Sequence, residues 1–248
     1  MAFKYGNAGI STRKLPDRLH GRRILHRVYF IILIVVSIIT VSIFLISKDE
    51  GIAVLGGIII TLILSPTTRE LNKYSKLERR VAKGAKAEEE IGDILHQLPD
   101  AYAVFHDINS PYGNIDHVVL DKENAIFLLE TKSHWGKVTY DGTSLLINEK
   151  HPEKNFIKQT FNNVFWLKEE LRKQTGLNVY VKAVIVFTNA IVGVTGTIKG
   201  ISVINKEHLI ETLLKEGIKK KYKEKDPHEV GLFTILYRLQ KSATPDKN

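Results

Sequence analysis

The sequence predicts an α/β domain with a mixed β-sheet flanked by helices, preceded by an α-helical hairpin that spans a membrane. Two uncharged apolar runs near the N-terminus predict the hairpin. The α/β domain is predicted by the order of the later segments, which read helix, three or more strands, helix, strand, strand and helix. The 248 residues are 44% apolar and 25% charged and include no cysteine. This composition excludes a disordered or collagen-like chain, disulfide bonds and a cysteine nucleophile.

The first apolar run covers residues 28–47 and carries no charged side chain. A helix of this length is about 30 Å long, which matches the hydrocarbon thickness of a bilayer. A cleavable signal peptide is the alternative, because a basic region precedes the run. The apolar core of such a peptide is about 7–15 residues long and ends in small residues. This run is longer and ends in Ser-Lys-Asp-Glu, which favours a membrane span.

The second apolar run covers residues 51–65 and stops at Pro66. Fifteen helical residues reach only about 22 Å, so this run crosses a bilayer only with local thinning or by drawing in its polar flanks. A buried or re-entrant segment is the alternative. Together the two runs predict a transmembrane hairpin over 28–65, and Gly56-Gly57 is a weak signal for a homo-oligomer formed through it.

The net charge of +9 is concentrated on both sides of this hairpin. Residues 1–27 carry a net charge of +6, residues 66–87 carry +5, and residues 88–248 carry −1. By the positive-inside rule, both flanks and therefore both termini face the cytoplasm of a protein in the cell membrane, where they contact anionic lipid. Because the basic residues have this explanation, the total charge is poor evidence for a nucleic-acid-binding face.

The predicted elements of the later domain follow from hydrophobic periodicity and turn residues. Helices are expected at 70–98, 155–173, 206–214 and 228–241, and strands at 102–106, 115–120, 125–132, 136–140, 144–148, 179–188 and 201–204. The helix at 155–173 is expected to bury Ile157, Phe161, Val164, Phe165 and Leu171. The chain then divides into a basic cytoplasmic arm (1–27), the hairpin (28–65), a basic juxtamembrane helix or linker (66–83), the main domain (84–216), and a linker, C-terminal helix and tail (217–248).

Charged side chains interrupt two neighbouring apolar strands. Glu130 and Lys132 follow five apolar residues, and Asp116 interrupts the strand before them. A hairpin around 121–124 would bring Asp116 within about a residue of Glu130. Two carboxylates suit a hard cation such as Mg²⁺, and a lysine can orient water or offset charge on phosphorus. The pattern predicts metal-assisted phosphodiester hydrolysis, and a structural salt bridge at a sheet edge is the alternative.

Asp116 followed by Glu130-Thr131-Lys132 resembles the D…(D/E)-x-K core of the restriction-endonuclease-like, or PD-(D/E)xK, superfamily. More narrowly, residues from about 80 to 205 resemble the nuclease-related domain, NERD. The segments that carry this resemblance are 84–88, 115–120, 129–132, 135–136 and 155–159. Ala87 and Phe156 depart from the family pattern, which commonly has glycine and proline at these positions.

The resemblance implies a restriction-endonuclease-like sheet and a Mg²⁺- or Mn²⁺-dependent nuclease that acts on DNA, with RNA as the second choice. It implies that Asp116 and Glu130 ligate the metal, that Lys132 is the catalytic lysine, and that Glu88 assists metal binding or holds the lysine. It also implies that Gln159 orients water or phosphate, although periodicity puts Gln159 opposite the expected apolar stripe.

A second function hypothesis is a catalytically inactive, membrane-tethered module of the same fold that binds nucleic acid or protein. The near-neutral domain favours it, because duplex binding relies on several lysine or arginine contacts to phosphates. The nuclease hypothesis is favoured by the acids and lysine on otherwise apolar strands, which are costly to keep without a function.

Overall fold

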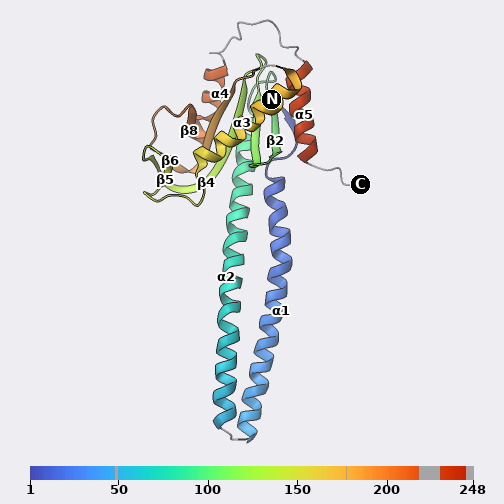
Figure 1. The fold of residues 1–248 in the computed structure, drawn as a ribbon, viewed down its shortest axis with the longest axis vertical. Coiled ribbons are helices and arrows are strands. Elements are labelled where there is room, and N and C mark those ends of the chain that lie inside the picture. The colour runs from blue at the N-terminus through green and yellow to red at the C-terminus, as the bar shows by residue number, and fades with distance from the viewer. Residues whose placement is uncertain (48–49, 177, 218–229, 244–248) are drawn as a thin grey trace. The chain divides into compact units, whose positions relative to one another are not determined.

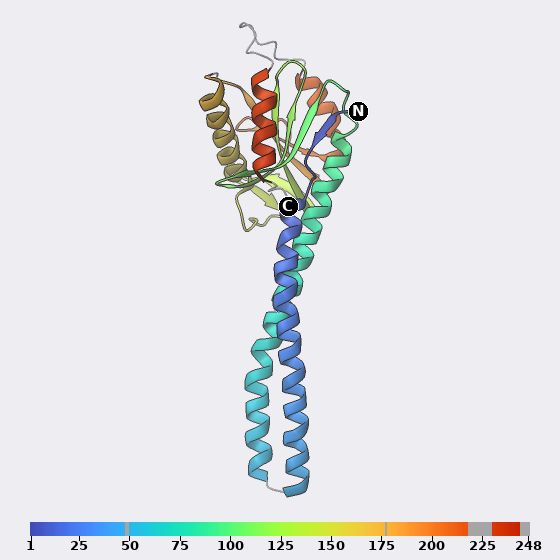
Figure 2. The same ribbon diagram turned by 90° about the vertical axis from the view of Figure 1, so that its right-hand side faces the viewer.

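The computed structural model describes residues 1–47, 50–176, 178–217 and 230–243 of the chain (Figures 1 and 2). The chain divides into a helical unit, Thr12–Ala82, and a sheet unit, which combines Met1–Ser11 with Lys83–Asn248. Residues 48–49 of the predicted hairpin turn, and the lysine run 219–221 of the predicted linker, lie outside the described residues.

The helical unit consists of most of α1 (Ile10–Ser47) and the first part of α2 (Glu50–Leu95). Within α1, Ile24–Ile43 is long and apolar enough to cross a membrane, with a mean hydropathy of 2.4. Ser37, Thr40 and Ser42 donate hydrogen bonds to backbone carbonyls four residues earlier at 2.7–2.9 Å, so their hydroxyls are satisfied within the helix, as hydrocarbon requires. Length and composition thus give a weak indication of one membrane span.

The second part of the predicted hairpin differs from expectation in its limits. The helix that contains residues 51–65 does not stop at Pro66 but continues as α2 to Leu95. Among the described residues, Ile24–Ile43 is the one helical segment that is long and apolar enough to cross a membrane, so a two-span hairpin is not shown. The predicted helix at 70–98 is therefore the C-terminal half of one long helix.

Within the described residues, the sheet unit contains a mixed eight-stranded sheet in the order β1-β2-β3-β4-β6-β8-β7, with β5 paired to β4. The strands are β1 (Phe3–Tyr5), β2 (Ala103–Ser110), β3 (Gly113–Leu120), β4 (Ile126–Tyr140), β5 (Leu145–Ile147), β6 (Val181–Val192), β7 (Thr197–Ile198) and β8 (Ile201–Asn205). β4, β6 and β8 are parallel, as are β1 and β2, and the other neighbours are antiparallel. The predicted fold class, a mixed sheet flanked by helices, is confirmed.

Helices cover both faces of this sheet (Figure 2). α3 (Phe156–Thr175) and α5 (Val230–Ala243) pack on one face, while the part of α2 from Lys83 onward and α4 (Leu209–Gly217), which follows the 3₁₀ turn Lys206–His208, pack on the other. The start of β4 alternates between the two cores: Ile126 and Leu128 contact the α3–α5 side, and Phe127 and Leu129 the α2–α4 side. This central position explains the continuous apolar run that precedes Glu130.

The buried face of α3 differs from the predicted one. Phe161 and Phe165 are exposed (39% and 64%), whereas Thr160 and Asn163 are fully buried. Asn163 can be buried because its side-chain oxygen accepts a hydrogen bond from the Ser110 hydroxyl at 2.7 Å. Of the five residues predicted to be buried, Ile157 and Leu171 are buried and Val164 packs against the core, so the prediction is right for these three and wrong for the two phenylalanines.

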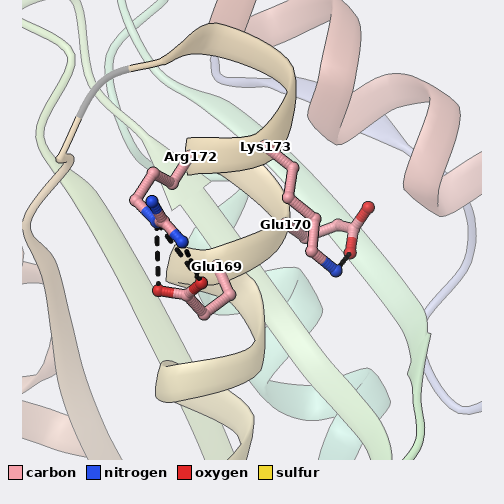
Figure 3. Close-up of polar contacts among 4 residues, drawn as sticks. All are labelled: Glu169, Glu170, Arg172 and Lys173. Carbon is pink, nitrogen blue, oxygen red and sulfur yellow. Dashed lines mark hydrogen bonds and ion pairs between the residues drawn. The ribbon is translucent and has the colours of Figure 1, made fainter.

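The ends and outer face of α3 follow local rules. The Asn155 side chain accepts a hydrogen bond from the Lys158 amide, and Gly176 ends the helix in the left-handed conformation with a hydrogen bond to the Arg172 carbonyl. In the last turns, Glu169 pairs with Arg172 at 2.8 Å and Glu170 with Lys173 at 3.5 Å, both at i,i+3 spacing (Figure 3). These pairs contribute little stability but mark the solvent-facing side.

β1 was not predicted from the sequence. Residues 3–5 pair in parallel with 103–105 of β2, so the first residues of the predicted N-terminal arm belong to the sheet unit. Tyr5 stacks on Phe105 with ring centroids 5.1 Å apart, and it also contacts Phe233 of α5. A three-residue strand has too little periodicity to be recognised without its partner strand.

Substitution of Gly136 by alanine is expected to destabilise the sheet unit by about 2–3 kcal/mol. Gly136 has φ +102°, and an added Cβ would collide with the Asn148 side chain, which accepts a hydrogen bond from the Lys137 amide. Gly142→Ala is the matched control, since Gly142 has φ +95° but open space around it. Denaturant unfolding should give the smaller loss for Gly142→Ala, and equal losses would contradict the proposed collision.

Candidate active site

Asp116 lies where β3 separates from β4. The last recorded pair of these antiparallel strands is His117 with Leu129, so the next position brings Asp116 opposite Glu130. The Asp116 Oδ2 atom accepts a hydrogen bond of 2.6 Å from the Thr131 amide, which ties the carboxylate to β4. The register predicted from the turn at 121–124 is confirmed to within one residue.

Glu130 and Lys132 form an ion pair on β4. Lys132 Nζ lies 2.5 Å from Glu130 Oε1, and the two side chains are 13% and 3% exposed. The second carboxylate oxygen, Glu130 Oε2, is buried with no hydrogen-bond partner among the described residues. A buried carboxylate oxygen without a partner is unfavourable, so this atom is an unused acceptor that can bind a cation or accept a hydrogen bond.

The electrostatics of Asp116 bring a third acid into the same site. Partial burial raises the pKa of Asp116 well above its usual range, and the negative charges of Glu130 and then Glu88 raise it further. The Lys132 ammonium and the Thr131 amide act in the opposite direction. Glu88 lies on the part of α2 that belongs to the sheet unit. The charges of Glu130 and Glu88 thus both act on Asp116, and the Lys132 ammonium offsets part of this repulsion.

Phe156 is a contributor that the sequence analysis did not identify as a site residue. Its ring lies 4.8 Å from Lys132 Nζ, and its centroid lies 5.2 Å from that of His134. In the sequence, residue 156 stands out only because phenylalanine replaces the proline that is common in the family it resembles. Phe156 is the first residue of α3 and follows the Asn155 cap, so the start of this helix brings an aromatic ring next to the lysine.

Gln159 lies one turn after Phe156 and is half-buried. Its side-chain oxygen is buried without a hydrogen-bond partner in the described part of the chain. Its neighbour one turn on, Asn163, is on the inward side of α3, so Gln159 is closer to the buried face than the predicted stripe implied. Within the described residues, no hydrogen bond of this oxygen joins Gln159 to the acidic site.

The donor set is chemically suited to a divalent cation, because Mg²⁺ and Mn²⁺ prefer carboxylate oxygens. The orphaned Glu130 Oε2 atom and the mutual repulsion at Asp116 fit this interpretation. The site is not preassembled, since no group of three or more His, Asp or Glu side chains among the described residues is already arranged to hold a metal ion. A cavity of about 700 Å³ in the sheet unit is lined by Ala87 and Glu89, on either side of Glu88, and by neither Asp116 nor Glu130.

Comparison with known proteins identifies one family. Residues 83–188 match the family described as the nuclease-related domain, NERD, which accounts for somewhat less than half of the chain. No curated protein and no solved structure matches. The matched segment begins in α2 just before Glu88 and ends in β6, so it contains all five predicted site residues.

Proposed function

We propose that this nuclease-related domain hydrolyses phosphodiester bonds of nucleic acid, DNA in preference to RNA, in the presence of Mg²⁺ or Mn²⁺. The observation that carries the proposal is the placement of Asp116 and of the Glu130–Lys132 ion pair where β3 and β4 separate, with Glu88 of α2 acting electrostatically on Asp116. Paired carboxylates beside a lysine are suited to metal-assisted attack of water on phosphorus, with cleavage of one P–O bond. The family match supports the same class of reaction.

Asp116 and Glu130 are the proposed metal ligands, with Glu88 as a third. When bound, a divalent cation supplies a Lewis acid for the phosphate and a more acidic water. Lys132 sits beside Glu130, where its ammonium can hold the attacking water or offset negative charge that develops on phosphorus. Gln159 is proposed to orient water or phosphate through its side-chain amide, whose oxygen has no partner within the described residues.

The domain is further proposed to act at the cytoplasmic face of the cell membrane. α1 contains one apolar segment able to cross a bilayer, and basic residues precede it. A second span over 51–65 would return the chain to the cytoplasm, where the flanks would contact anionic lipid. Pairing of the hairpin with copies of itself remains part of this proposal through Gly56-Gly57.

The alternative proposal is a catalytically inactive module that binds nucleic acid or protein. It is favoured by the net charge of −1 over residues 88–248, because duplex binding needs phosphate-neutralising cations. The two proposals differ in whether the carboxylates bind a metal ion and whether phosphodiester bonds are cleaved.

A cleavage assay with the full chain in detergent tests the proposal. Wild-type protein should cut linear or supercoiled DNA with Mg²⁺ or Mn²⁺ and not with EDTA, and Asp116→Asn should remove cleavage and weaken metal binding in calorimetry. Asparagine is nearly isosteric and retains an acceptor for the Thr131 amide. Asp121→Asn is the matched control, because Asp121 also accepts backbone hydrogen bonds but lies in the β3–β4 turn. Cleavage by Asp116→Asn at the wild-type rate would contradict the proposed site.

A further inference from the structure

The cavity of about 700 Å³ in the sheet unit has its own chemistry. Its lining includes Lys83, Lys86 and Asp93 of α2, Trp135 of β4 and Asn189 of β6. Trp135 is 65% exposed, and Lys83 Nζ lies 5.4 Å from the centre of its ring. A large indole left open to solvent beside a cation is unusual for a side chain that serves only the core.

The backbone separates this cavity from the ion pair on the same strand. β4 and β6 are paired in register up to Lys132 with Phe187 and again from Trp135 with Asn189. Between these pairs, residues 133–134 of β4 lie opposite the single residue 188 of β6, so β4 contains a β-bulge. Side chains alternate between the two faces of a strand, so residues three apart point to opposite sides: Lys132 contacts Phe156 of α3, whereas Trp135 lines a cavity with α2.

The cavity nevertheless adjoins the candidate active site through two elements. Ala87 and Glu89, which flank Glu88, line it on α2, and Trp135 follows Lys132 by three residues on β4. The stretch from Lys132 to Trp135 matches the stretch from Phe187 to Asn189 on β6, so at about 3.3 Å per strand residue the two positions are about 7 Å apart along the sheet. Because Lys132 points toward α3 and Trp135 toward α2, a nucleic-acid strand must be several nucleotides long to touch both the carboxylates and the indole.

We infer that Trp135 is a stacking platform for an unpaired base of a nucleic-acid strand, with Lys83 and Lys86 on the adjoining phosphates. This inference rests on the proposed function and specifies its substrate as single-stranded nucleic acid. An aromatic face can stack on any base that has left the duplex, and a duplex offers no such face. Asp93 and Asn189 supply polar groups that can hydrogen-bond the edge of that base.

The charges of the cavity agree with this ligand. Its lysines are accompanied by Glu89, Glu90 and Asp93, so the lining lacks the excess of cations that a duplex backbone requires. One neutral base and one or two phosphates need fewer cations. A site dominated by stacking also reconciles nucleic-acid binding with the near-neutral charge of residues 88–248.

Binding is tested on the full chain in detergent with EDTA, so that cleavage cannot interfere. A 12-nucleotide single strand should quench tryptophan fluorescence, and Trp135→Ala should weaken its binding on the order of tenfold or more. Trp135→Phe should retain most of the affinity, and Trp166→Phe, which changes the other tryptophan of the chain, should match the wild type. Lys83→Gln and Lys86→Gln should each lower the salt slope of binding by about 0.7.

Three results would overturn the inference: affinity of Trp135→Ala within twofold of wild type, equal affinity for a duplex of the same length, or a free mononucleotide that binds as tightly as the strand. The last result would assign the cavity to a free nucleotide. If the wild-type protein binds the strand through Trp135 but does not cleave DNA, the proposed hydrolysis is contradicted and the proposed stacking site is not.

Discussion

Replacement of Lys132 by methionine is expected to lower the rate of metal-dependent DNA cleavage by about 10²–10⁴-fold, the usual contribution of a positioned proton-transfer group. The Lys132 ammonium is 2.5 Å from Glu130, contacts the Phe156 ring and is only 13% exposed, so its position is tightly defined. Methionine preserves the length and apolar stem of the side chain while it removes the charge. The measurement is the cleavage rate of the full chain at saturating Mg²⁺ or Mn²⁺.

A purely structural ion pair would give a different pattern. Removal of the ammonium leaves Glu130 buried without its partner, which costs about 3 kcal/mol of folding stability whatever the function. Denaturant unfolding must therefore accompany the rate measurement, so that rates are compared on folded protein. Lys137→Met is the matched control, because Lys137 lies exposed on the same strand. A folded Lys132→Met variant that cleaves within threefold of wild type would identify the pair as structural.

Acidification is expected to destabilise the sheet unit through a buried histidine pair. His106 Nδ1 and His117 Nδ1 are 2.7 Å apart, and both residues are fully buried. One ring donates and the other accepts, and both Nε2 atoms are buried without a hydrogen-bond partner among the described residues, so a further proton would place an uncompensated charge in the core. Burial, together with the positive charge of Lys4 and His96, lowers the pKa of His106 to about 3, and burial lowers the pKa of His117 well below its usual value.

The direction of the pH effect follows from these lowered pKa values. Above pH 6.5 the histidines are neutral in both states and do not change stability. Between pH 6.5 and about 3 the unfolded chain binds protons that the folded chain refuses, so the free energy of unfolding falls as the pH falls. For His106 alone the full loss is about 4–5 kcal/mol, at 1.36 kcal/mol for each unit of pKa.

Denaturant unfolding at several pH values between 7.5 and 4 measures this loss. The double variant His106→Phe, His117→Leu should unfold with a smaller pH dependence, because it replaces both hydrogen-bonding partners with apolar groups. His208→Gln changes an exposed histidine and should keep the wild-type pH dependence. An unchanged pH dependence in the double variant would assign the acid sensitivity to other groups, such as the carboxylates.

Prediction from sequence succeeded where the signal is local. The apolar run 126–129, the Asn155 cap and the turn at 121–124 each specify their own backbone, so the start of β4, the start of α3 and the β3–β4 register agree with expectation. The separate strands expected at 125–132 and 136–140 are instead one continuous strand, Ile126–Tyr140. The pairing of Asp116 with Glu130 could be predicted from the sequence because a tight hairpin allows few registers. The roles of Glu88 and Gln159 came from resemblance alone and stay predictions.

Prediction failed where a contact between distant segments decides the outcome. Asn163 on the buried side of α3 is satisfied by a hydrogen bond from Ser110, which is 53 residues away in the sequence. β1 exists because β2 offers it an edge, and Phe156 reaches Lys132 only when α3 packs against β4. None of these partners is visible in the periodicity of one segment.

By itself the sequence determined the order of the elements, an apolar helix able to span a bilayer, and the acids and lysine at the end of a buried strand. These features depend on neighbours a few residues apart, whose geometry the backbone imposes. Only the tertiary structure decided that Glu88 lies within electrostatic reach of Asp116, that Phe156 contacts Lys132, and that Trp135 lines a cavity with α2. Those arrangements depend on how helices pack on a twisted sheet, which residue order alone does not specify.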